Sequence, residues 1–296
     1  MLFIGELSAL ITAFLWSGSS IVFASATLRI GSLQVNINRM IFAVCLLLIT
    51  ILLSGLDVEL SFWQIFYLAI SGIVGLVFGD TFLFKAFQHI GARLSMLLLS
   101  LAPAIAALLA YVFLNESLSI LGIFGILVTL IGIGIVVFER NETPSSRYKI
   151  SKIGILFGLL AAIGQGTGLV FAKVAFEMGE INGFVATFIR VLFSLLLLMP
   201  AAMLARKFKN PVKIFSNDKK SFWLVLAGAM IGPFLGITFS LIAIAHTKVG
   251  IASTIMATVP VVMLPMVRFI YKEKLSSKAV IGAFLAVIGV AVLFLI

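Results

Sequence analysis

Long apolar runs, separated by short polar or charged connections, dominate the pattern along the chain. Ten windows are long and apolar enough to predict helices that each cross a membrane. The runs are continuous, as in Leu46–Leu53, whereas strands of a membrane β-barrel alternate between lipid-facing and lumen-facing residues. The predicted spans cover about residues 3–27, 36–54, 63–88, 92–114, 120–138, 153–176, 183–205, 221–245, 250–271 and 277–296.

The composition supports the same assignment. Hydrophobic residues make up 62% of the 296 residues and charged residues 11%, with a mean hydropathy of +1.26. Soluble domains lie nearer ~45–50% apolar and ~25% charged. The single cysteine, Cys45, excludes an internal disulfide and a cysteine-based metal cluster. The first window lacks a basic start and exceeds a signal-peptide core in length, so we expect it to be retained as the first span.

The distribution of lysine and arginine predicts the orientation, because basic connections favour the cytoplasmic side. With ten spans, Lys248 is the basic residue in connections on the side of the chain ends, and 15 basic residues lie on the other side. We therefore predict a multi-pass protein of the inner or plasma membrane with outward-facing termini. The net charge of +10 then reflects anionic lipids at the basic cytoplasmic loops, and no nucleic-acid partner is predicted. The 15 residues are Arg29, Arg93, Arg140, Arg147, Lys149, Lys152, Arg206, Lys207, Lys209, Lys213, Lys219, Lys220, Lys272, Lys274 and Lys278.

An internal repeat divides the chain. Arg39 recurs as Arg190, and six residue pairs share one constant spacing: Pro103/Pro260, Glu116/Glu273, Leu118/Leu275, Ser119/Ser276, Gly125/Gly282 and Gly132/Gly289. Each copy holds five predicted spans, and an odd number of crossings inverts the second copy. We predict an all-α polytopic membrane protein with ten transmembrane helices in two inverted-topology five-helix repeats, residues 1–138 and 153–296, joined by a linker at 139–152. A duplicated scaffold without a transport site is the alternative.

Both copies carry the same short motifs. They are Trp16-Ser17-Gly18-Ser19, Arg39 and Pro103 through Asn115-Glu116-Ser117-Leu118, and then Gln165-Gly166-Thr167-Gly168, Arg190 and Pro260 through Lys272-Glu273-Lys274-Leu275. In these motifs each half resembles the five-helix unit of the EamA-type family, in the drug/metabolite transporter superfamily, over essentially the whole chain. The resemblance implies transport of small organic solutes through a cavity lined mainly by the first, third and fourth helices of each half. Ten-helix members commonly have cytoplasmic termini, whereas the charge distribution here predicts the reverse.

Asp80 is the main candidate for substrate binding or coupling. It lies near the middle of the third predicted span, where an ionisable group is costly and therefore suggests function. It could couple transport to protons or bind a substrate ammonium group. The alternative is a structural carboxylate that neighbouring hydroxyls cap or that one arginine pairs. Counting back from Gly91 and Gly250, its repeat counterpart is Phe239.

Polar residues at mid-span extend the set of substrate-binding or coupling candidates. Those in equivalent windows are Trp16, Ser17 and Ser19 in the first span and Gln165 and Thr167 in the sixth. Together they could provide hydrogen-bonding groups and an aromatic wall for a small polar ligand, with interhelical hydrogen bonds as the alternative. Lys173 shares a helix face with Thr167 and is a further candidate, unless its amine snorkels to the interface.

Four residues with repeat symmetry are structural or gating candidates. Arg39 and Arg190 are predicted near the starts of equivalent spans, where binding carbonyls or headgroups is favoured over binding substrate. Pro103 and Pro260 permit kinks within spans because proline removes a backbone donor. Glycines at four-residue spacing, such as Gly75 with Gly79, predict close helix contacts.

The sequence thus predicts a secondary-active transporter of small organic solutes that works by alternating access, with proton coupling and the oligomeric state left open. An enzyme is not predicted. An intramembrane aspartyl protease needs two apposed carboxyls, and Asp80 is the one aspartate inside a predicted span. His89 and His246 lack the spacing of a zinc hydrolase. The sequence also contains no phosphate-binding loop. No metal or cofactor is therefore expected. A lipid scramblase is the main alternative function, and an intramembrane hydrolase is a weaker one.

Overall fold

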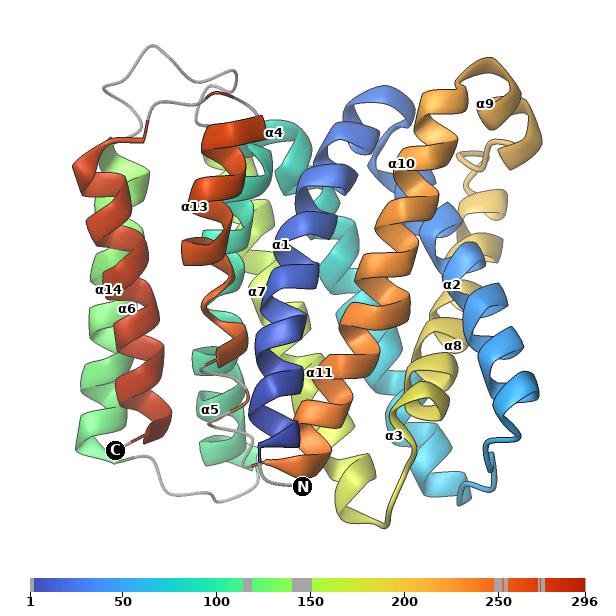
Figure 1. Ribbon diagram of the computed structural model, residues 1–296, viewed down its shortest axis with the longest axis horizontal. Coiled ribbons are helices and arrows are strands. Elements are labelled where there is room, and N and C mark those ends of the chain that lie inside the picture. Colours follow the sequence, from blue (N-terminus) through green and yellow to red (C-terminus); the bar gives the residue numbers. More distant parts are fainter. Residues whose placement is uncertain are drawn as a thin grey trace.

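The computed structural model describes residues 3–113, 119–139, 151–247, 252, 255–270, 272 and 275–295. Every regular element in these ranges is a helix (Figure 1). The N-terminal part contains α1 (Ile4–Ile30), α2 (Ser32–Ser54), α3 (Phe62–Gly72), the π-helical segment η1 (Ile73–Gly79), α4 (Asp80–Leu99), α5 (Ala102–Phe113) and α6 (Ile120–Glu139). The C-terminal part contains α7 (Lys152–Glu177), α8 (Gly183–Leu204), α9 (Pro211–Asn217), α10 (Lys219–Ala229), the π-helical segment η2 (Met230–Phe234), α11 (Leu235–His246), α13 (Val259–Ile270) and α14 (Ser277–Leu295).

Several sequence predictions fall outside the described residues. They concern most of the linker at 139–152, the motif end Asn115-Glu116-Ser117-Leu118, and Arg140, Arg147, Lys149, Lys248, Glu273 and Lys274.

Seven helices in the described ranges are long and apolar enough to cross a membrane, and this supports the prediction of an all-helical membrane protein. They are Ile4–Ile30, Ser32–Ser54, Phe62–Leu99, Ile120–Val137, Lys152–Glu177, Gly183–Leu204 and Lys219–His246. The stretch Phe62–Leu99 joins α3, η1 and α4, and Gly91 within it has a φ of 75°. Glycine tolerates this left-handed backbone, so the helix breaks there. Shorter apolar helices follow at Val259–Ile270 and Ser277–Val292.

Two further breaks precede α5 and α13. A turn at residues 100–101 separates α4 from α5, and a turn at residues 257–258 precedes α13. Pro103 and Pro260 are each the second residue of the helix that follows. Proline fits there because the first N–H groups of a helix have no intrahelical partner. Both prolines therefore begin new helices, as well as removing a donor.

The π-helical segments establish the structural register between the two parts. Each follows an 11-residue helix, α3 or α10, and the residues that begin η1 and η2 are Ile73 and Met230. In this register the counterpart of Asp80 is Ile237, and the assignment of Phe239 is wrong. Counting back from Gly91 and Gly250 instead misplaces the counterpart by two residues.

The first helix of each part packs against the other part. Helix α7 contacts α3, η1, α4 and α5, and α1 contacts α10, η2, α11 and α13. Glycines permit these approaches: a Cβ on Gly164 of α7 would lie 2.6 Å from the Cα atom of Gly79, and a Cβ on Gly236 would lie 2.8 Å from Cδ1 of Trp16 on α1. The predicted role of the spaced glycines in close packing is confirmed at these contacts.

The remaining elements frame this interlocked centre. Helices α6 and α14 lie side by side at one edge of the molecule (Figure 1), where the Thr129 hydroxyl donates to the carbonyl of Ala286 (3.3 Å). Helix α1 begins and α14 ends on one side of the molecule, and α9 lies on the opposite side (Figure 1). The basic connection between α8 and α10, from Arg206 to Lys220, lies on the side of α9.

Candidate functional site

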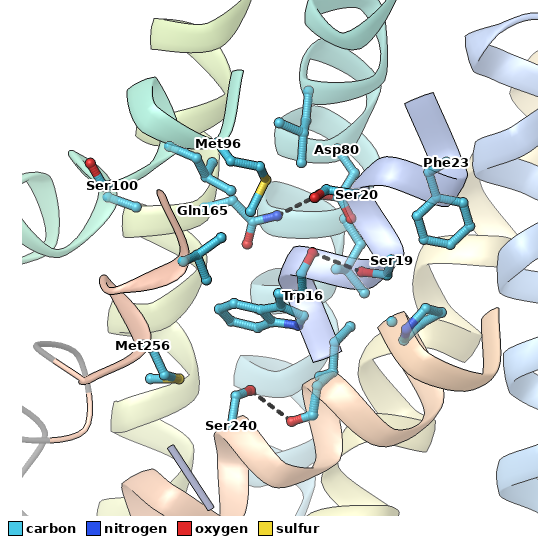
Figure 2. A pocket seen from close by; sticks show the side chains of 18 of the residues that line it. Trp16, Ser19, Ser20, Phe23, Asp80, Met96, Ser100, Gln165, Ser240 and Met256 are labelled. Atoms are coloured by element: carbon cyan, nitrogen blue, oxygen red, sulfur yellow. Dashed lines mark hydrogen bonds between the residues drawn. The ribbon is translucent and has the colours of Figure 1, made fainter. Parts of the chain in front are cut away.

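A central cavity lies where the two parts meet. Its volume is about 130 Å³, far above the roughly 10–15 Å³ that one water needs. Residues of α1, α2, η1, α4 and α5 line it from the N-terminal part, and residues of α7, α8, η2, α11 and α13 from the C-terminal part. Figure 2 shows polar side chains and Trp16 facing this space among apolar neighbours. The polar lining residues are Ser19, Ser20, Arg39, Asp80, Ser100, Gln165, Arg190 and Ser240.

Arg39, which lines this cavity, has polar, charged and aromatic partners within the protein. Its Nε atom donates to Oδ1 of Asn36 (3.0 Å), and its Nη2 atom donates to Oδ2 of Asp80 in a buried ion pair. The guanidinium carbon also lies over the rings of Phe84, at 4.9 Å, and Phe23, at 5.8 Å. The residue is 4% exposed, so its charge is compensated within the protein.

Arg190 has the same place in its helix but different surroundings. Arg39 is the eighth residue of α2, and Arg190 is the eighth residue of α8. Arg190 is 3% exposed and lines the cavity. Its Nε atom is buried without a hydrogen-bond partner among the described residues. The two arginines therefore differ in how far the protein satisfies them.

Gln165 connects the two parts at the carboxylate. Its Nε2 atom donates to Oδ1 of Asp80 (2.6 Å) and also lies 3.2 Å from the carbonyl oxygen of Gly75; the bond to Asp80 is drawn in Figure 2. Among the described residues that line the cavity, the charged side chains are Arg39, Asp80 and Arg190. With each in its ordinary ionised form, the lining carries one net positive charge.

The helix breaks bring two helix N-termini to the cavity. Ala102 and Pro103 of α5, and Val259 and Pro260 of α13, all belong to the lining. A helix N-terminus carries a partial positive charge and free N–H groups. Discontinuous helices of this kind form ligand sites in many secondary transporters. The breaks therefore add to the positive potential that Arg190 provides.

The structure places most, but not all, of the candidate residues on the lining. It brings together Trp16, Ser19, Arg39, Asp80, Pro103, Gln165, Arg190 and Pro260. Ser17 is fully buried and donates to the carbonyls of Ala13 (2.7 Å) and Val259 (3.4 Å). Thr167 donates to the carbonyl of Ile163 (2.8 Å), and Lys173 pairs with Glu177 across 3.7 Å. These three candidates are not among the lining residues.

Two expectations about the charged residues need revision. Arg39 does not lie at the interface near a helix start, because α2 begins at Ser32 and the buried guanidinium contacts Asp80. Arg190 likewise lies within the centre. For Asp80, the arginine pairing that the structural alternative required is present, and the same carboxylate also faces the cavity.

Sequence reasoning missed three lining serines. Ser20, Ser100 and Ser240 line the cavity, and all three are labelled in Figure 2. Ser20 continues the polar run that begins at Ser17, and Ser100 lies three residues before Pro103. Both positions carried a signal in the sequence, namely an adjacent polar run and a proline that marks a break.

Two stretches of the chain, residues 3–138 and 152–295, match the EamA-like transporter family. The chain belongs to this family. Membership in the drug/metabolite transporter superfamily follows, and the resemblance drawn from the sequence is confirmed. The chain is therefore a multi-pass membrane protein of a transporter family.

Two of three similar proteins carry transporter names. An uncharacterized transporter of Archaeoglobus fulgidus is 21% identical over 98% of this chain and 97% of its own length. An uncharacterized transporter of Clostridium kluyveri is 29% identical over 48% of this chain, a match that spans 45% of that relative. Protein LicB of Haemophilus influenzae is 25% identical over 77% of this chain and 75% of its own length. The two relatives named as transporters support a membrane transporter.

The fold is shared with a solved structure. A crystal structure of another protein covers 98% of this chain and 96% of its own length, with a TM-score of 0.69 and 20% sequence identity. At that identity the likeness concerns the fold alone.

Proposed function

We propose that this EamA-family member is a secondary-active transporter that moves a small organic solute by alternating access. Ten spans in two inverted five-helix repeats would enclose the substrate site at their junction. The observation that carries the proposal is the central cavity, which corresponding elements of both parts line: α1 and α7, α2 and α8, η1 and η2, and the broken helices at Pro103 and Pro260. Binding between inverted repeats near the midplane is the pattern of many secondary transporters.

The breaks at Gly91, Pro103 and Pro260 provide the proposed moving points. Bundle motions in transporters need a few residues that absorb the change in backbone angles. Pro103 and Pro260 line the cavity. Gly91 lies within α4, between the lining residues Phe87 and Met96. The close glycine contacts of α1 and α7 would then be the surfaces along which the two parts move.

Asp80 is the proposed site of proton coupling. Among the described lining residues, the charged groups that face it are Arg39 and Arg190. A proton on Asp80 would remove the counter-ion of Arg39, so proton uptake and the occupancy of the cavity would be linked. Because Asp80→Asn alone leaves Arg39 uncompensated, the paired variant Arg39→Gln/Asp80→Asn is the better test. We expect its transport to lose dependence on a pH gradient, and unchanged coupling would contradict the assignment.

The proposed membrane placement follows the charge distribution. The side of α9 carries the basic connection between α8 and α10, which would face the cytoplasm and contact anionic lipids. Both chain ends would face outward across the cell membrane. A reporter fused to either terminus and active only in the cytoplasm should remain silent, and activity would reverse the orientation.

Reconstitution tests the function directly. Purified protein in liposomes should exchange labelled small solutes between the lumen and the medium, at a rate that saturates and that an excess of the unlabelled solute inhibits. Labelled phospholipid in the same vesicles should stay in its leaflet. Lipid flipping without exchange of any solute would instead favour a scramblase.

A further inference from the structure

Arg190 differs from Arg39 because the hydrogen-bond acceptor, the counter-ion and the nearer aromatic ring of Arg39 have all changed in the second copy. The register is confirmed by two equivalent contacts: Nδ2 of Asn36 donates to the Thr81 hydroxyl (3.1 Å), and the Thr238 hydroxyl lies 3.4 Å from that of Thr187. Asn36, which accepts from Arg39, thus corresponds to Thr187. That hydroxyl is already donated to the carbonyl of Gly183 (2.7 Å).

Two further contacts of Arg39 are replaced by aliphatic side chains. Asp80, the counter-ion of Arg39, corresponds to Ile237, and Phe84, which stacks under Arg39, corresponds to Leu241. Neither an isoleucine nor a leucine can accept a hydrogen bond or balance a charge. The second copy therefore keeps the buried arginine but lacks the amide acceptor, the counter-ion and the nearer aromatic ring that contact Arg39 in the first copy.

A buried guanidinium without a dedicated partner is costly. The Nε atom of Arg190 has no hydrogen-bond partner among the described residues, and Asp80, which interacts with it electrostatically, is already bound by Arg39 and Gln165. The Arg190 side chain also lines the cavity, and its Nη2 atom lies beside Gly75, 3.5 Å from where a Cβ on that residue would be. The site therefore suits an acceptor that the described residues do not provide.

On the basis of the proposed function, we propose that Arg190 binds a carboxylate of the transported solute. The guanidinium presents paired N–H donors that match a carboxylate, and the N-termini of α5 and α13 reach the same cavity. A single carboxylate would balance the one net positive charge of the lining, whereas a phosphate dianion would exceed it. The apolar lining, which includes Trp16, Phe87 and Met256, suits an uncharged, largely apolar remainder.

Ligand-dependent thermal stability tests this binding independently of transport, because a ligand that binds the folded state stabilises it by an amount that grows with the logarithm of its affinity. The probes are monocarboxylates such as benzoate and hexanoate, each beside its own carboxamide, together with inorganic phosphate. Wild-type protein in nanodiscs should be stabilised saturably by carboxylates and not by the matching amides. Arg190→Gln should weaken carboxylate binding by roughly ten- to hundredfold, the range for a charge-assisted hydrogen bond.

Two variants serve as controls. Arg190→Lys keeps the charge but loses the planar fork, so an intermediate affinity is expected, and it remains informative if Arg190→Gln fails to fold. Lys213→Gln removes one positive charge from exposed α9, and its affinities should equal those of the wild type.

The contradicting outcomes are distinct. No preference for any carboxylate over its amide, a preference for phosphate, or a preference that survives in Arg190→Gln would overturn the inference. A protein that exchanges neutral solutes and ignores carboxylates would contradict this inference alone. Carboxylate binding without exchange of any solute would contradict the proposed function and leave the Arg190 site in place.

Discussion

The surroundings of Arg39 and Arg190 show how two copies of one helical unit diverge. Both arginines are the eighth residue of the second helix in their part, and both are buried in the lining of one cavity. Arg39 is bound by Asn36, Asp80 and an aromatic ring. Arg190 has Thr187, Ile237 and Leu241 at the equivalent positions. The two arginines have the same position in their helices, but only Arg39 has a dedicated counter-ion and hydrogen-bond acceptor among the described residues. This difference is the basis for proposing that the first site stabilises the protein and the second binds the solute.

The largest expected effect comes from breaking the satisfied site. Asp80→Asn removes the counter-ion of Arg39 in a buried pair, which typically costs about 3–5 kcal/mol of the free energy of unfolding. Arg190→Gln removes a charge that has no dedicated partner among the described residues, so no comparable loss is expected. Thermal unfolding of the purified proteins would measure both, and the paired variant Arg39→Gln/Asp80→Asn should recover most of the loss. Equal losses in Asp80→Asn and Arg190→Gln would remove the distinction between the two sites.

A smaller loss is expected where α3 passes α8. A Cβ on Gly72 would collide with the backbone carbonyl oxygen of Arg190 and approach Oγ of Ser194 to 2.7 Å. Because backbone cannot give way locally, Gly72→Ala should lower the free energy of unfolding by about 1–3 kcal/mol. The equivalent residue in α10 is already Ala229, which is fully buried, so Ala229→Gly should cost only about 0.5–1 kcal/mol, the helix-propensity difference. A tolerated Gly72→Ala would mean that α8 moves freely against α3.

Restoring a counter-ion beside Arg190 would test whether this arginine recognises the carboxylate. Ile237→Asp places a carboxylate at the position that Asp80 occupies in the first part. The introduced carboxylate should pair with the Arg190 guanidinium. The preference of the protein for carboxylates over amides, measured by thermal stabilisation, should then fall by about tenfold or more. Asparagine has nearly the shape of aspartate but no charge, so Ile237→Asn should keep the preference for carboxylates over amides. If Ile237→Asp leaves the preference unchanged, Arg190 is not the group that recognises the carboxylate.

The sequence predicted the helices and most of the cavity, because both follow from simple patterns. Apolar windows coincide with the seven helices in the described ranges that are long and apolar enough to cross a membrane, and polar residues at mid-span, such as Trp16 and Gln165, line the cavity. Depth along a span, however, does not define the direction of a side chain. Ser17 and Thr167 lie beside lining residues yet donate to carbonyls of their own helices.

The pairing of charges was beyond the sequence. The register between the copies follows the π-helical segments, so counting back from Gly91 and Gly250 gave Phe239 instead of Ile237 as the counterpart of Asp80. That error hid the contrast between the arginines. The proximity of Arg39 to Asp80, 41 positions apart, depends on how α2 packs against α4, which no local pattern in the chain specifies.

The smallest expected effect distinguishes the N-terminal caps of α3 and α10, which begin equivalent helices. Ser61 caps α3 in an uncharged capping box with Gln64, so Ser61→Ala should cost about 1 kcal/mol, equally at neutral and acidic pH. Asp218 caps α10 and pairs with Arg29 (2.8 Å). The hydrogen bond from Arg29 holds the pKa of the Asp218 carboxyl well below its ordinary value.

A carboxyl whose pKa is lower in the folded state stabilises the protein fully above its unfolded pKa, about 3.9 for aspartate, and loses that contribution as the pH falls toward the folded pKa. Asp218→Asn keeps a capping oxygen and removes the charge. Its deficit in thermal stability should therefore be small at pH 7, because the pair is exposed, and should shrink further below about pH 4. The deficit of Ser61→Ala should stay constant over the same range. A constant Asp218→Asn deficit would show that the ion pair with Arg29 contributes nothing and that capping alone anchors α10 as it does α3.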